Sequence, residues 1–465
     1  MTEHPAQNLR IAIVGGGLAG LAAGCALAGS GFRVTLFERR PYLGGRASSY
    51  QHPGTGEVVD NCQHVLLGCC TNLIQFYERL GVERKIRWYD RLTFLEPGGR
   101  ASVIEPSILP APFHNASAFL RASCLDLSDK LTIGMAMAVL APVMPRDTGE
   151  TFLAWLRRHA QTKQAVERFW KPVLVSALNE ELDGMSVPYA AQVVRESFLK
   201  SAAAGRMGVP TVPLTELYSV AGDYIAAHGG EIRLRCSVEA FVPGPDPVKL
   251  LASGGEASFD FVVFAVPFDV LSRILPQTPE ARPLGQVLTR FETSPITGIH
   301  LWFDRQITEL DHAVLLDRTI QWMFHKSKLL GRNENGSYVE LVVSSSKTLV
   351  EKSRTEIVEL ALAELREFFP GARDAKLVKS TVIKEVHATY SPRPGIDVYR
   401  PRPETVWPRV FLAGDWISTG WPATMEGAVR SGYMAAESVA RVAGIGDATF
   451  LVSNLPASGL MRFFG

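Results

Sequence analysis

Apolar residues near the start of the chain form short continuous runs separated by glycines. Residues 11–14 (IAIV) have the length and composition of a strand buried on both faces. The Ala-rich run over residues 18–29 predicts a helix that ends before Gly31, and residues 33–37 predict a second strand. Strand, glycine turn, helix and strand in this order predict the first unit of a doubly wound α/β sheet.

Further along the chain the apolar spacing changes twice. Apolar and aromatic residues over 152–170 recur at helical intervals, and we expect residues 106–207 to be mainly helical. The run over 131–144 is the longest apolar stretch, yet it is too short to cross a bilayer and predicts a buried or interfacial helix. Later apolar runs predict strands over 232–242, 259–266, 298–303, 338–343 and 410–413, and a long helix follows the last of them.

The turn after the first run has the spacing of a dinucleotide-binding fingerprint. Gly15, Gly17 and Gly20 fit G-x-G-x-x-G directly after a strand, and Glu38 closes the second strand about twenty residues later. The first glycine permits the tight turn, the second lets backbone approach a pyrophosphate, and the third lets the helix pack on the strand. Leu18 and Ala19 open this helix, so we expect its N-terminal N–H groups to face the phosphates.

A second glycine pair and a block near the C-terminus extend this prediction. Gly44 and Gly45, followed by Arg46, indicate FAD rather than NAD. In the C-terminal block, a strand runs into a Gly-Asp pair, and about ten residues later a helix opens whose N–H groups are suited to the anionic side of a reduced flavin. The residues predicted here to bind the cofactor are Gly414, Asp415, Thr424, Met425, Glu426 and Ala428.

The fingerprint and the C-terminal block lie nearly 400 residues apart, so the cofactor domain must be discontinuous. At 465 residues the chain is also long for a single core. We assign the FAD-binding domain to residues 8–92, 215–275 and 405–445, and a substrate-binding domain to 93–214 and 276–404, the latter including the helical section 106–207.

Composition excludes some classes of function. Lys and Arg total 48 and Asp and Glu total 47, so no net field attracts nucleic acid. The six cysteines have no C-x-x-C spacing and no evident disulfide framework, which indicates reduced thiols in a cytoplasmic protein. No charged, apolar leader precedes residue 11, so no signal peptide is expected. The sequence predicts no metal site.

These motifs together resemble the amine oxidase and phytoene desaturase superfamily of flavoproteins. The resemblance covers nearly the whole chain, and it implies a Rossmann-like FAD-binding domain with an inserted α+β substrate domain and a helical cap. It further implies that FAD binds non-covalently and in an extended conformation, with Arg46 near the phosphates and Val238 at the adenine. Arg39, His64 and Val65 complete the expected cofactor contacts.

A narrower resemblance rests on residues 60–68, DNCQHVLLG, on SPITGIHLWFDR over 294–305, and on the run that begins at Asp415. These segments are similar to those of the hydroxysqualene dehydroxylases, although Cys62 stands where that pattern has glycine. The resemblance implies that reduced FAD converts hydroxysqualene to squalene with loss of water, in the route to hopanoids or sterols. Such chemistry requires an acid for the leaving hydroxyl, exclusion of water and a long apolar tunnel.

Three residues are candidates for catalysis. His64 lies in the segment expected beside the flavin, and His300 lies within the apolar strand GIHLWF, from which it could point into the same cavity. Either could act as the acid or position one. Asp60 could bond His64 or the ribityl chain. The alternatives are a core histidine hydrogen-bonded within an apolar strand for His300 and a turn cap for Asp60.

Other functions and partners stay open. A carotenoid desaturase or isomerase would share the fold, FAD and an apolar tunnel. A flavin amine oxidase would need an aromatic cage, whereas the C-terminal block supplies Trp421 without a second aromatic residue nearby. A non-enzymatic flavoprotein would bind FAD without turnover. We expect an isoprenoid substrate, an external reductant for FAD, and weak peripheral contact of the tail, residues 460–464, with the inner face of a membrane.

Overall fold

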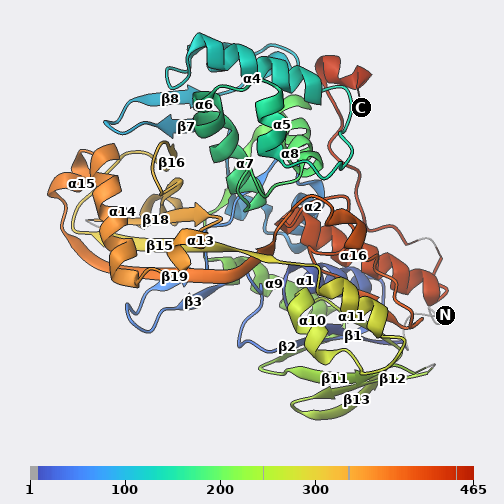
Figure 1. Cartoon of the computed structure of the whole chain (residues 1–465). Coiled ribbons are helices and arrows are strands. Elements are labelled where there is room, and N and C mark those ends of the chain that lie inside the picture. Colours follow the sequence, from blue (N-terminus) through green and yellow to red (C-terminus); the bar gives the residue numbers. More distant parts are fainter. Residues whose placement is uncertain (1–8, 245, 333–335, 447, 465) are drawn as a thin grey trace.

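A parallel sheet in one lobe of the molecule brings together the two ends and the middle of the chain. The computed structural model describes residues 9–244, 246–332, 336–446 and 448–464. The sheet has the strand order β10-β2-β1-β14-β20 (Figure 1). Its strands are β1 (Arg10–Val14), β2 (Arg33–Glu38), β10 (Glu231–Leu234), β14 (Phe261–Phe264) and β20 (Val410–Leu412). The α/β fold class predicted from the sequence is confirmed.

Helix α1 (Leu18–Gly29) is buried on all sides because other helices pack around it against this sheet. Its sequence is apolar on every face, and only Gly29 of its residues is exposed. Helices α16 (Met425–Val442) and α9 (Leu214–Ala227) contact it. A Cβ at Gly432 of α16 would lie 2.2 Å from the carbonyl oxygen of Ala19, so the C-terminal helix packs directly on the backbone of the fingerprint helix.

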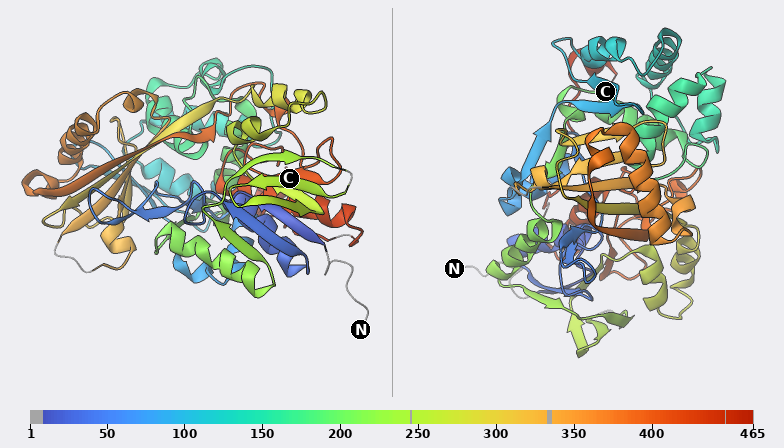
Figure 2. Two further views of the ribbon diagram at one scale, coloured as in Figure 1. Left: turned by 90° about the horizontal axis from the view of Figure 1, so that it is seen from below. Right: turned by 90° about the vertical axis from the view of Figure 1, so that its left-hand side faces the viewer.

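A larger, mixed sheet forms the second lobe. Two long antiparallel strands, β15 (Thr293–Phe303) and β19 (Leu377–Tyr390), extend from this lobe toward the first (Figure 2). The strand order is β19-β15-β18-β17-β16-β7-β8, and α14 (Arg354–Phe368) covers one face. The remaining strands are β18 (Ser337–Ser344), β17 (Trp322–His325), β16 (His312–Leu315), β7 (Leu92–Leu95) and β8 (Ala101–Ile104).

The segment predicted to be mainly helical lies above both sheets. It forms α3 (Ala116–Arg121), α4 (Leu127–Leu140), α5 (Phe152–Arg158), α6 (Lys163–Ala165), α7 (Lys171–Leu178) and α8 (Val187–Val193) (Figure 1). The apolar run over 131–144 is helical as far as Leu140. In the described part of the chain, every helix is too short or too polar to span a membrane.

One strand prediction is wrong in its extent. The run over 232–242 is not a single strand, because β10 ends at Leu234 and β11 (Val238–Val242) starts a separate antiparallel sheet with β12 (Val248–Ala252) and β13 (Gly255–Phe259). Arg235 between them has φ +54°, a left-handed conformation that ends an extended strand. Periodicity alone could not reveal this break, because both pieces have strand composition.

The remaining elements connect these layers. Short sheets pair β3 (Ser49–Gln51) with β4 (Val58–Asp60), and β9 (Met207–Pro210) with β5 (Leu66–Leu67) and β6 (Ile86–Tyr89). The other helices are α2 (Thr71–Leu80), α10 (Phe268–Ile274), α11 (Arg282–Leu288), α12 (Lys326–Leu329), α13 (Lys347–Val350) and α15 (Gly371–Asp374).

Candidate cofactor and active site

A cavity of about 550 Å³ is lined by residues of both lobes. Its walls include the turn after β1, the start of α16, the loop over 61–65 and parts of β15, β17 and β18. Of the residues predicted to bind the cofactor, those in the wall are Gly15, Gly17, Leu18, Ala19, Glu38, Arg39, Gly44, Gly45, Arg46, His64, Val65, Val238, Gly414, Asp415, Thr424, Met425 and Ala428. Four predicted site residues lie outside this lining: Gly20, Asp60, His300 and Glu426.

Two glycines show why the turn at the base of the cavity tolerates no side chain. A Cβ at Gly20 would lie 1.9 Å from the carbonyl oxygen of Gly15, so α1 could not approach the turn. A Cβ at Gly45 would lie 2.8 Å from the Cα of Gly17. Because glycine has no Cβ, the backbones of the two glycine segments can lie in contact. The result is an open, backbone-lined groove at the N-terminus of α1, the geometry that binds phosphate groups.

Glu38 is fixed at the end of β2 by two backbone hydrogen bonds. Its carboxylate accepts from the N–H of Gly16 and from the N–H of Arg40, each at 2.7 Å. The residue is buried within the protein but belongs to the cavity wall. A carboxylate held at this position is suited to accept hydrogen bonds from ribose hydroxyls.

Arg46 and Asp415 link the N-terminal and C-terminal parts of the cavity wall. Nη2 of Arg46 lies 2.7 Å from Oδ1 of Asp415, and Nη1 donates to the carbonyl of Ala388 at 2.6 Å. Burial by itself would lower the pKa of Arg46, but the carboxylates around it, Asp415 foremost, together outweigh burial and raise it. The guanidinium therefore stays charged in the cavity wall, where it is suited to bind an anionic group.

The start of α16 provides a second helix N-terminus at the cavity. The Oγ1 of Thr424 caps the helix by accepting from the N–H of Gly427 at 3.1 Å. Thr424, Met425 and Ala428 all line the cavity. Two helix N-termini, a buried carboxylate and a charged arginine around one cavity fit an extended dinucleotide such as FAD.

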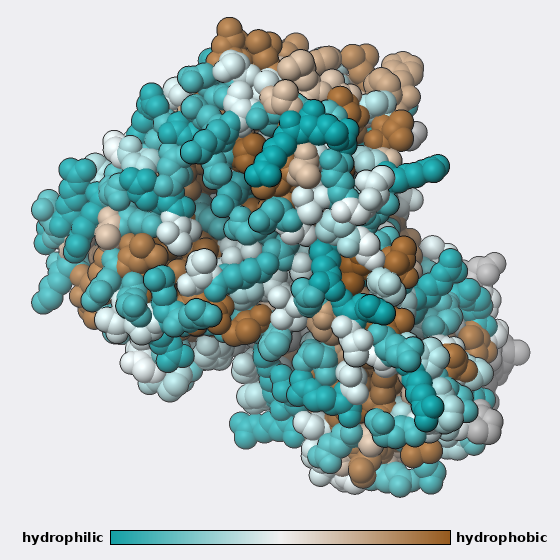
Figure 3. Space-filling model, viewed as in Figure 1, coloured by the Kyte–Doolittle hydropathy of each residue, from teal (hydrophilic) through white to brown (hydrophobic). Residues whose placement is uncertain are grey.

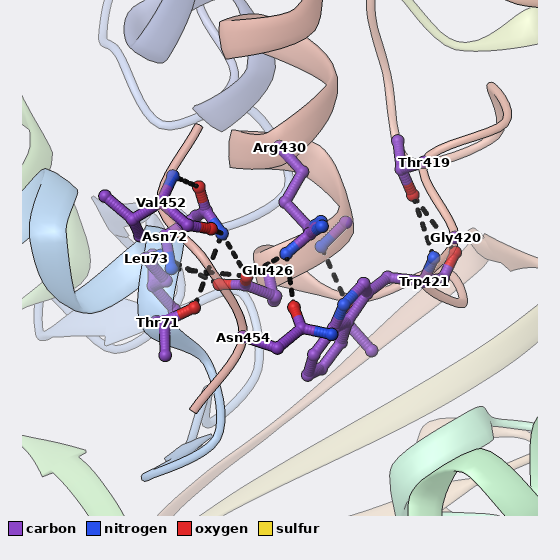
Figure 4. Close-up of polar contacts among 12 residues, drawn as sticks. Thr71, Asn72, Leu73, Thr419, Gly420, Trp421, Glu426, Arg430, Val452 and Asn454 are labelled. Carbon is purple, nitrogen blue, oxygen red and sulfur yellow. Dashed lines mark hydrogen bonds and ion pairs between the residues drawn. The ribbon is translucent and has the colours of Figure 1, made fainter. Parts of the chain in front are cut away.

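Glu426 faces away from this cavity. Its carboxylate is fully buried and accepts from the backbone N–H groups of Asn72 and Leu73 at 3.2 and 2.8 Å, at the start of α2 (Figure 4). Arg430 lies 3.4 Å from the same carboxylate. Burial raises the pKa of Glu426 above its usual value. The structure therefore places this side chain at the α2–α16 contact and outside the cavity lining.

His64 lies in the cavity wall with one ring nitrogen already engaged. Its Nδ1 is 2.7 Å from the carbonyl oxygen of Cys62, which can only accept, so Nδ1 carries the hydrogen. Burial lowers the pKa of His64, so the ring is neutral at pH 7 and Nε2 has a lone pair. In this state His64 is an acceptor or base, not the proton donor that the sequence led us to consider.

Cys62 adopts this position without strain. It is not among the non-glycine residues with positive φ in the described chain. The glycine of the resembling pattern is therefore not required here for backbone conformation.

Asp60 lies beneath the loop and pairs with a lysine that sequence reasoning did not identify. Its Oδ2 is 2.6 Å from Nζ of Lys326, and its Oδ1 accepts from the N–H of Leu214 at 3.1 Å. Lys326 also donates to Oε1 of Gln63 at 2.8 Å. Burial opposes ionisation of Asp60, but the Lys326 ammonium, together with hydrogen bonds from Leu214 and Ser49, outweighs burial and lowers the carboxyl pKa. Asp60 thus supports the loop that carries His64 and does not bond to His64 itself.

His300 lies in the same buried cluster. Its Nδ1 is 2.8 Å from the hydroxyl of Tyr338 and 4.0 Å from Oε2 of Glu340, and its side chain is fully buried. Burial and the nearby Lys326 lower the pKa of His300 to about 3, whereas burial raises that of Glu340 to about 8. At pH 7 His300 is neutral and Glu340 is protonated. The ring does not reach the cavity, contrary to the orientation considered from the sequence.

The wall contributed by the larger sheet is mainly apolar. Ile296, Trp322, Phe324 and Val342 line it. The rings of Trp322 and Phe324 stack on one another with their centroids 5.5 Å apart, and both residues belong to β17. They therefore do not form two opposed walls of an aromatic cage. Trp421, the aromatic residue singled out in the C-terminal block, is buried and is not part of the lining.

One carboxylate in this wall was also missed from the sequence. Glu385 of β19 lines the cavity, and its Oε2 accepts from the side-chain amide of Asn61 at 3.0 Å. Lys326, Glu340 and Glu385 lie in strands or helices distant in sequence from any motif. The only local signal was a charged residue within an otherwise strand-like apolar run, as in WMFHK and VELVV.

Comparison with known proteins agrees with this geometry. The family model described as flavin containing amine oxidoreductase matches residues 18–440. A 15-cis-phytoene desaturase of Synechococcus elongatus is 28% identical, over 93% of this chain and 96% of its own length. A probable zeta-carotene desaturase of the same organism is 25% identical, over 93% of this chain and 98% of its own length.

Solved structures give the same fold at lower identity. A putrescine oxidase variant superposes with a TM-score of 0.73 and 16% identity, covering 94% of this chain and 99% of that one. The cyclohexylamine oxidase of Brevibacterium oxydans superposes with a TM-score of 0.71 and 16% identity, with the same coverage. At such identity the likeness concerns the fold.

Proposed function

This chain belongs to the family of flavin containing amine oxidoreductases, and from that premise we propose that it reduces hydroxysqualene to squalene with loss of water. Membership implies FAD and oxidoreductase chemistry. The substrate and the direction of electron flow are our proposal. The observation that supports them most is the position of the segment over 60–68: its residues Asn61 to Val65 line the cavity that Ile296, Phe324 and Val342 make apolar on another side.

The cofactor's part in the proposed reaction is simple. When bound, reduced FAD would supply the hydride that replaces the hydroxyl group, while one proton from the protein would let the hydroxyl leave as water. The residues that would hold it are Glu38 at the ribose, Arg46 near the phosphates and the N-terminus of α16 at the ring. We expect FAD to bind non-covalently and an external reductant to regenerate it.

The protein's own residues would control the substrate. Apolar walls at Ile296, Phe324 and Val342 would bind an isoprenoid chain and keep bulk water from a cationic carbon. Nε2 of neutral His64 would accept a hydrogen bond from the substrate hydroxyl and orient it. A group other than His64 must then provide the proton. Glu385 is the candidate, because it is the carboxyl group that β19 contributes to the cavity wall, next to Asn61.

A carotenoid desaturase is the second candidate, and the similarity to phytoene desaturases over nearly the full chain favours it. Both candidates need a long apolar substrate next to FAD, but they differ in the direction of hydride transfer. A flavin amine oxidase is less consistent with the cavity, because Trp322 and Phe324 stack along one strand and do not oppose each other.

One anaerobic experiment separates the candidates. Purified, FAD-loaded protein is mixed with reduced flavin and hydroxysqualene, and products are measured by gas chromatography. We expect squalene in proportion to the flavin oxidised. Parallel reactions contain phytoene with an electron acceptor, or putrescine with oxygen and a peroxide assay. Desaturated phytoene or peroxide, with no squalene, would refute the proposal in favour of the corresponding alternative.

A further inference from the structure

The outer face of α4 has no charged side chain. Its exposed residues are Leu127, Ser128, Leu131, Gly134, Met135, Ala138 and Val139. Leu127, Leu131, Met135 and Val139 follow each other at intervals of four, and their side chains are 50–68% exposed. A surface helix usually presents polar residues to water, so this face differs from a solvated one.

The opposite face of α4 fixes the helix in the protein. Ile133, Ala136 and Leu140 are buried in the core of the helical section. Asp126 and Asp129 form a capping box at the start of the helix. The exposed apolar residues are therefore held outward by a packed and capped helix.

Two other segments continue the apolar surface. The N–H of Leu460 donates to the carbonyl of Ala111 at 2.8 Å, and the guanidinium of Arg195 bonds the carbonyls of Leu140 and Phe464, each at 3.1 Å. Nζ of Lys130 in α4 donates to the carbonyl of Leu120. The exposed apolar residues of these segments are Ile108, Leu109, Phe113, Leu120, Leu460, Phe463 and Phe464.

We call the exposed apolar residues of α4 and of these two segments the α4 face. Apolar residues gather along the top edge of the molecule, where α4 lies beside the C-terminal segment (Figure 3). The tail expected from the sequence to contact a membrane is only one part of this larger surface, and Met461 within it is buried in the core.

The charges around the α4 face favour an anionic partner. Arg121, Arg146 and Arg462 are exposed around it. Two exposed carboxylates lie in the chain on either side of α4, so the three arginines outnumber them: Asp126 caps the helix, and Asp147 accepts from the N–H groups of Gly149 and Gly395 at 3.0 and 2.7 Å.

We propose that the α4 face inserts into the interface of a lipid bilayer that contains anionic lipids. An apolar helix face lying parallel to the surface, with aromatic residues beside it and arginines around it, is the arrangement that interfacial binding requires. A contiguous apolar surface built from three chain segments is larger than isolated exposed residues would explain. This inference does not depend on the substrate, because it rests on the outer surface alone.

Vesicle co-sedimentation of the FAD-loaded, full-length protein tests the proposal. Vesicles of phosphatidylcholine with phosphatidylglycerol should bind the wild type. The variant Leu131→Ser/Val139→Ser should bind about tenfold more weakly, because two inserted side chains are lost. The matched control Val398→Ser/Val406→Ser removes two apolar residues elsewhere that are more exposed, at 82% and 65%, and should bind as the wild type does. Pure phosphatidylcholine vesicles should bind less well than the anionic ones.

Three results would overturn the proposal. The first is that the wild type stays in the supernatant with both vesicle types. The second is that the α4 variant and the control bind equally well. The third is that the wild type forms a dimer without lipid and that Leu131→Ser/Val139→Ser dissociates this dimer. The last would assign the α4 face to a second copy of the chain. Flavin absorbance and the melting temperature of each variant check that it is folded. Squalene formation plays no part in the readout, so failure here is separate from failure of the proposed reaction.

Discussion

One hydrogen bond determines what His64 can contribute to chemistry. Because the carbonyl of Cys62 accepts from Nδ1, the free nitrogen of the neutral ring is Nε2. The sequence could indicate a histidine near the flavin but could not choose between acid and acceptor, since tautomer and burial depend on the folded loop. The cluster of Lys326, Asp60 and Glu340 beneath this loop is likewise visible only once α12, β18 and β4 lie together.

Replacing His64 tests its role as an acceptor. His64→Ala should keep FAD and lose about 100-fold in turnover, the usual scale for misplacing a reacting group that a hydrogen bond would orient. Because burial lowers the pKa of His64 below 6.5, wild-type kcat/KM should stay constant near neutral pH and fall only at acidic pH, as the ring becomes protonated. Wild-type activity in flavin-replete His64→Ala would remove this residue from the mechanism.

Glu340 should make stability depend on pH. Its folded-state pKa is raised from 4.5 to about 8, so the folded state holds a proton that the unfolded state releases. The free energy of unfolding should therefore decrease as pH rises from about 4.5 to about 8. In Glu340→Gln this part of the dependence should be absent, as measured by urea unfolding across that range. An unchanged pH profile in the variant would contradict the assignment of a protonated Glu340.

At the scale of elements, the predicted strands and helices near the fingerprint agree with the structure almost to the residue. Helix α1 occupies the predicted residues 18–29, and β2 ends at Glu38. Local signals were enough there because glycine, apolar composition and strand length all favoured one arrangement. The run over 232–242 was divided by the conformation of Arg235, which no periodicity reports.

Close packing of α1 on its turn leads to a prediction for Gly20. Gly20→Ala should destabilise the protein by about 1–3 kcal/mol and weaken FAD binding, because its Cβ would overlap the carbonyl of Gly15. Gly285→Ala in α11 is the control, since the nearest atom to its Cβ would be 3.9 Å away. Urea unfolding and flavin titration measure the two effects. Tight FAD binding by Gly20→Ala would show that the turn can relax.

The α2–α16 contact gives a prediction for Glu426. Because its carboxylate accepts two backbone N–H groups of α2, Glu426→Ala should destabilise the protein by about 1–3 kcal/mol. FAD affinity per folded molecule should be unchanged, since this side chain is not in the cavity wall. Thermal unfolding and flavin titration provide the measurements. A large loss of flavin affinity with normal stability would place Glu426 at the cofactor after all.

At the scale of the whole molecule, the cavity joins segments from the beginning, the middle and the end of the chain. Arg46 pairs with Asp415, residues that are 369 positions apart. A ligand that contacts all three segments binds only when they are assembled, so it stabilises the fold as a whole.

Added FAD should therefore raise the melting temperature of the flavin-free protein. At 100 times the dissociation constant the stabilisation should be about 2.7 kcal/mol. Asp415→Asn should show a smaller rise, because the pairing across the cavity wall is weakened. Calorimetry with and without FAD makes the comparison. An unchanged melting temperature at saturating FAD would argue against a cavity that holds the lobes together.

The sequence by itself determined the α/β class, and all the residues that it predicted to bind the cofactor lie in the cavity wall except Gly20 and Glu426. These features depend on glycine spacing, on apolar runs and on an acid at a strand end, all of which act over a few neighbouring residues. The tertiary structure decided the rest: that Glu426 faces α2, that His300 is enclosed behind the wall, and that Lys326 holds the loop of His64. Those outcomes depend on which distant side chains share a buried volume, where the cost of an unpaired charge selects partners that no local pattern contains.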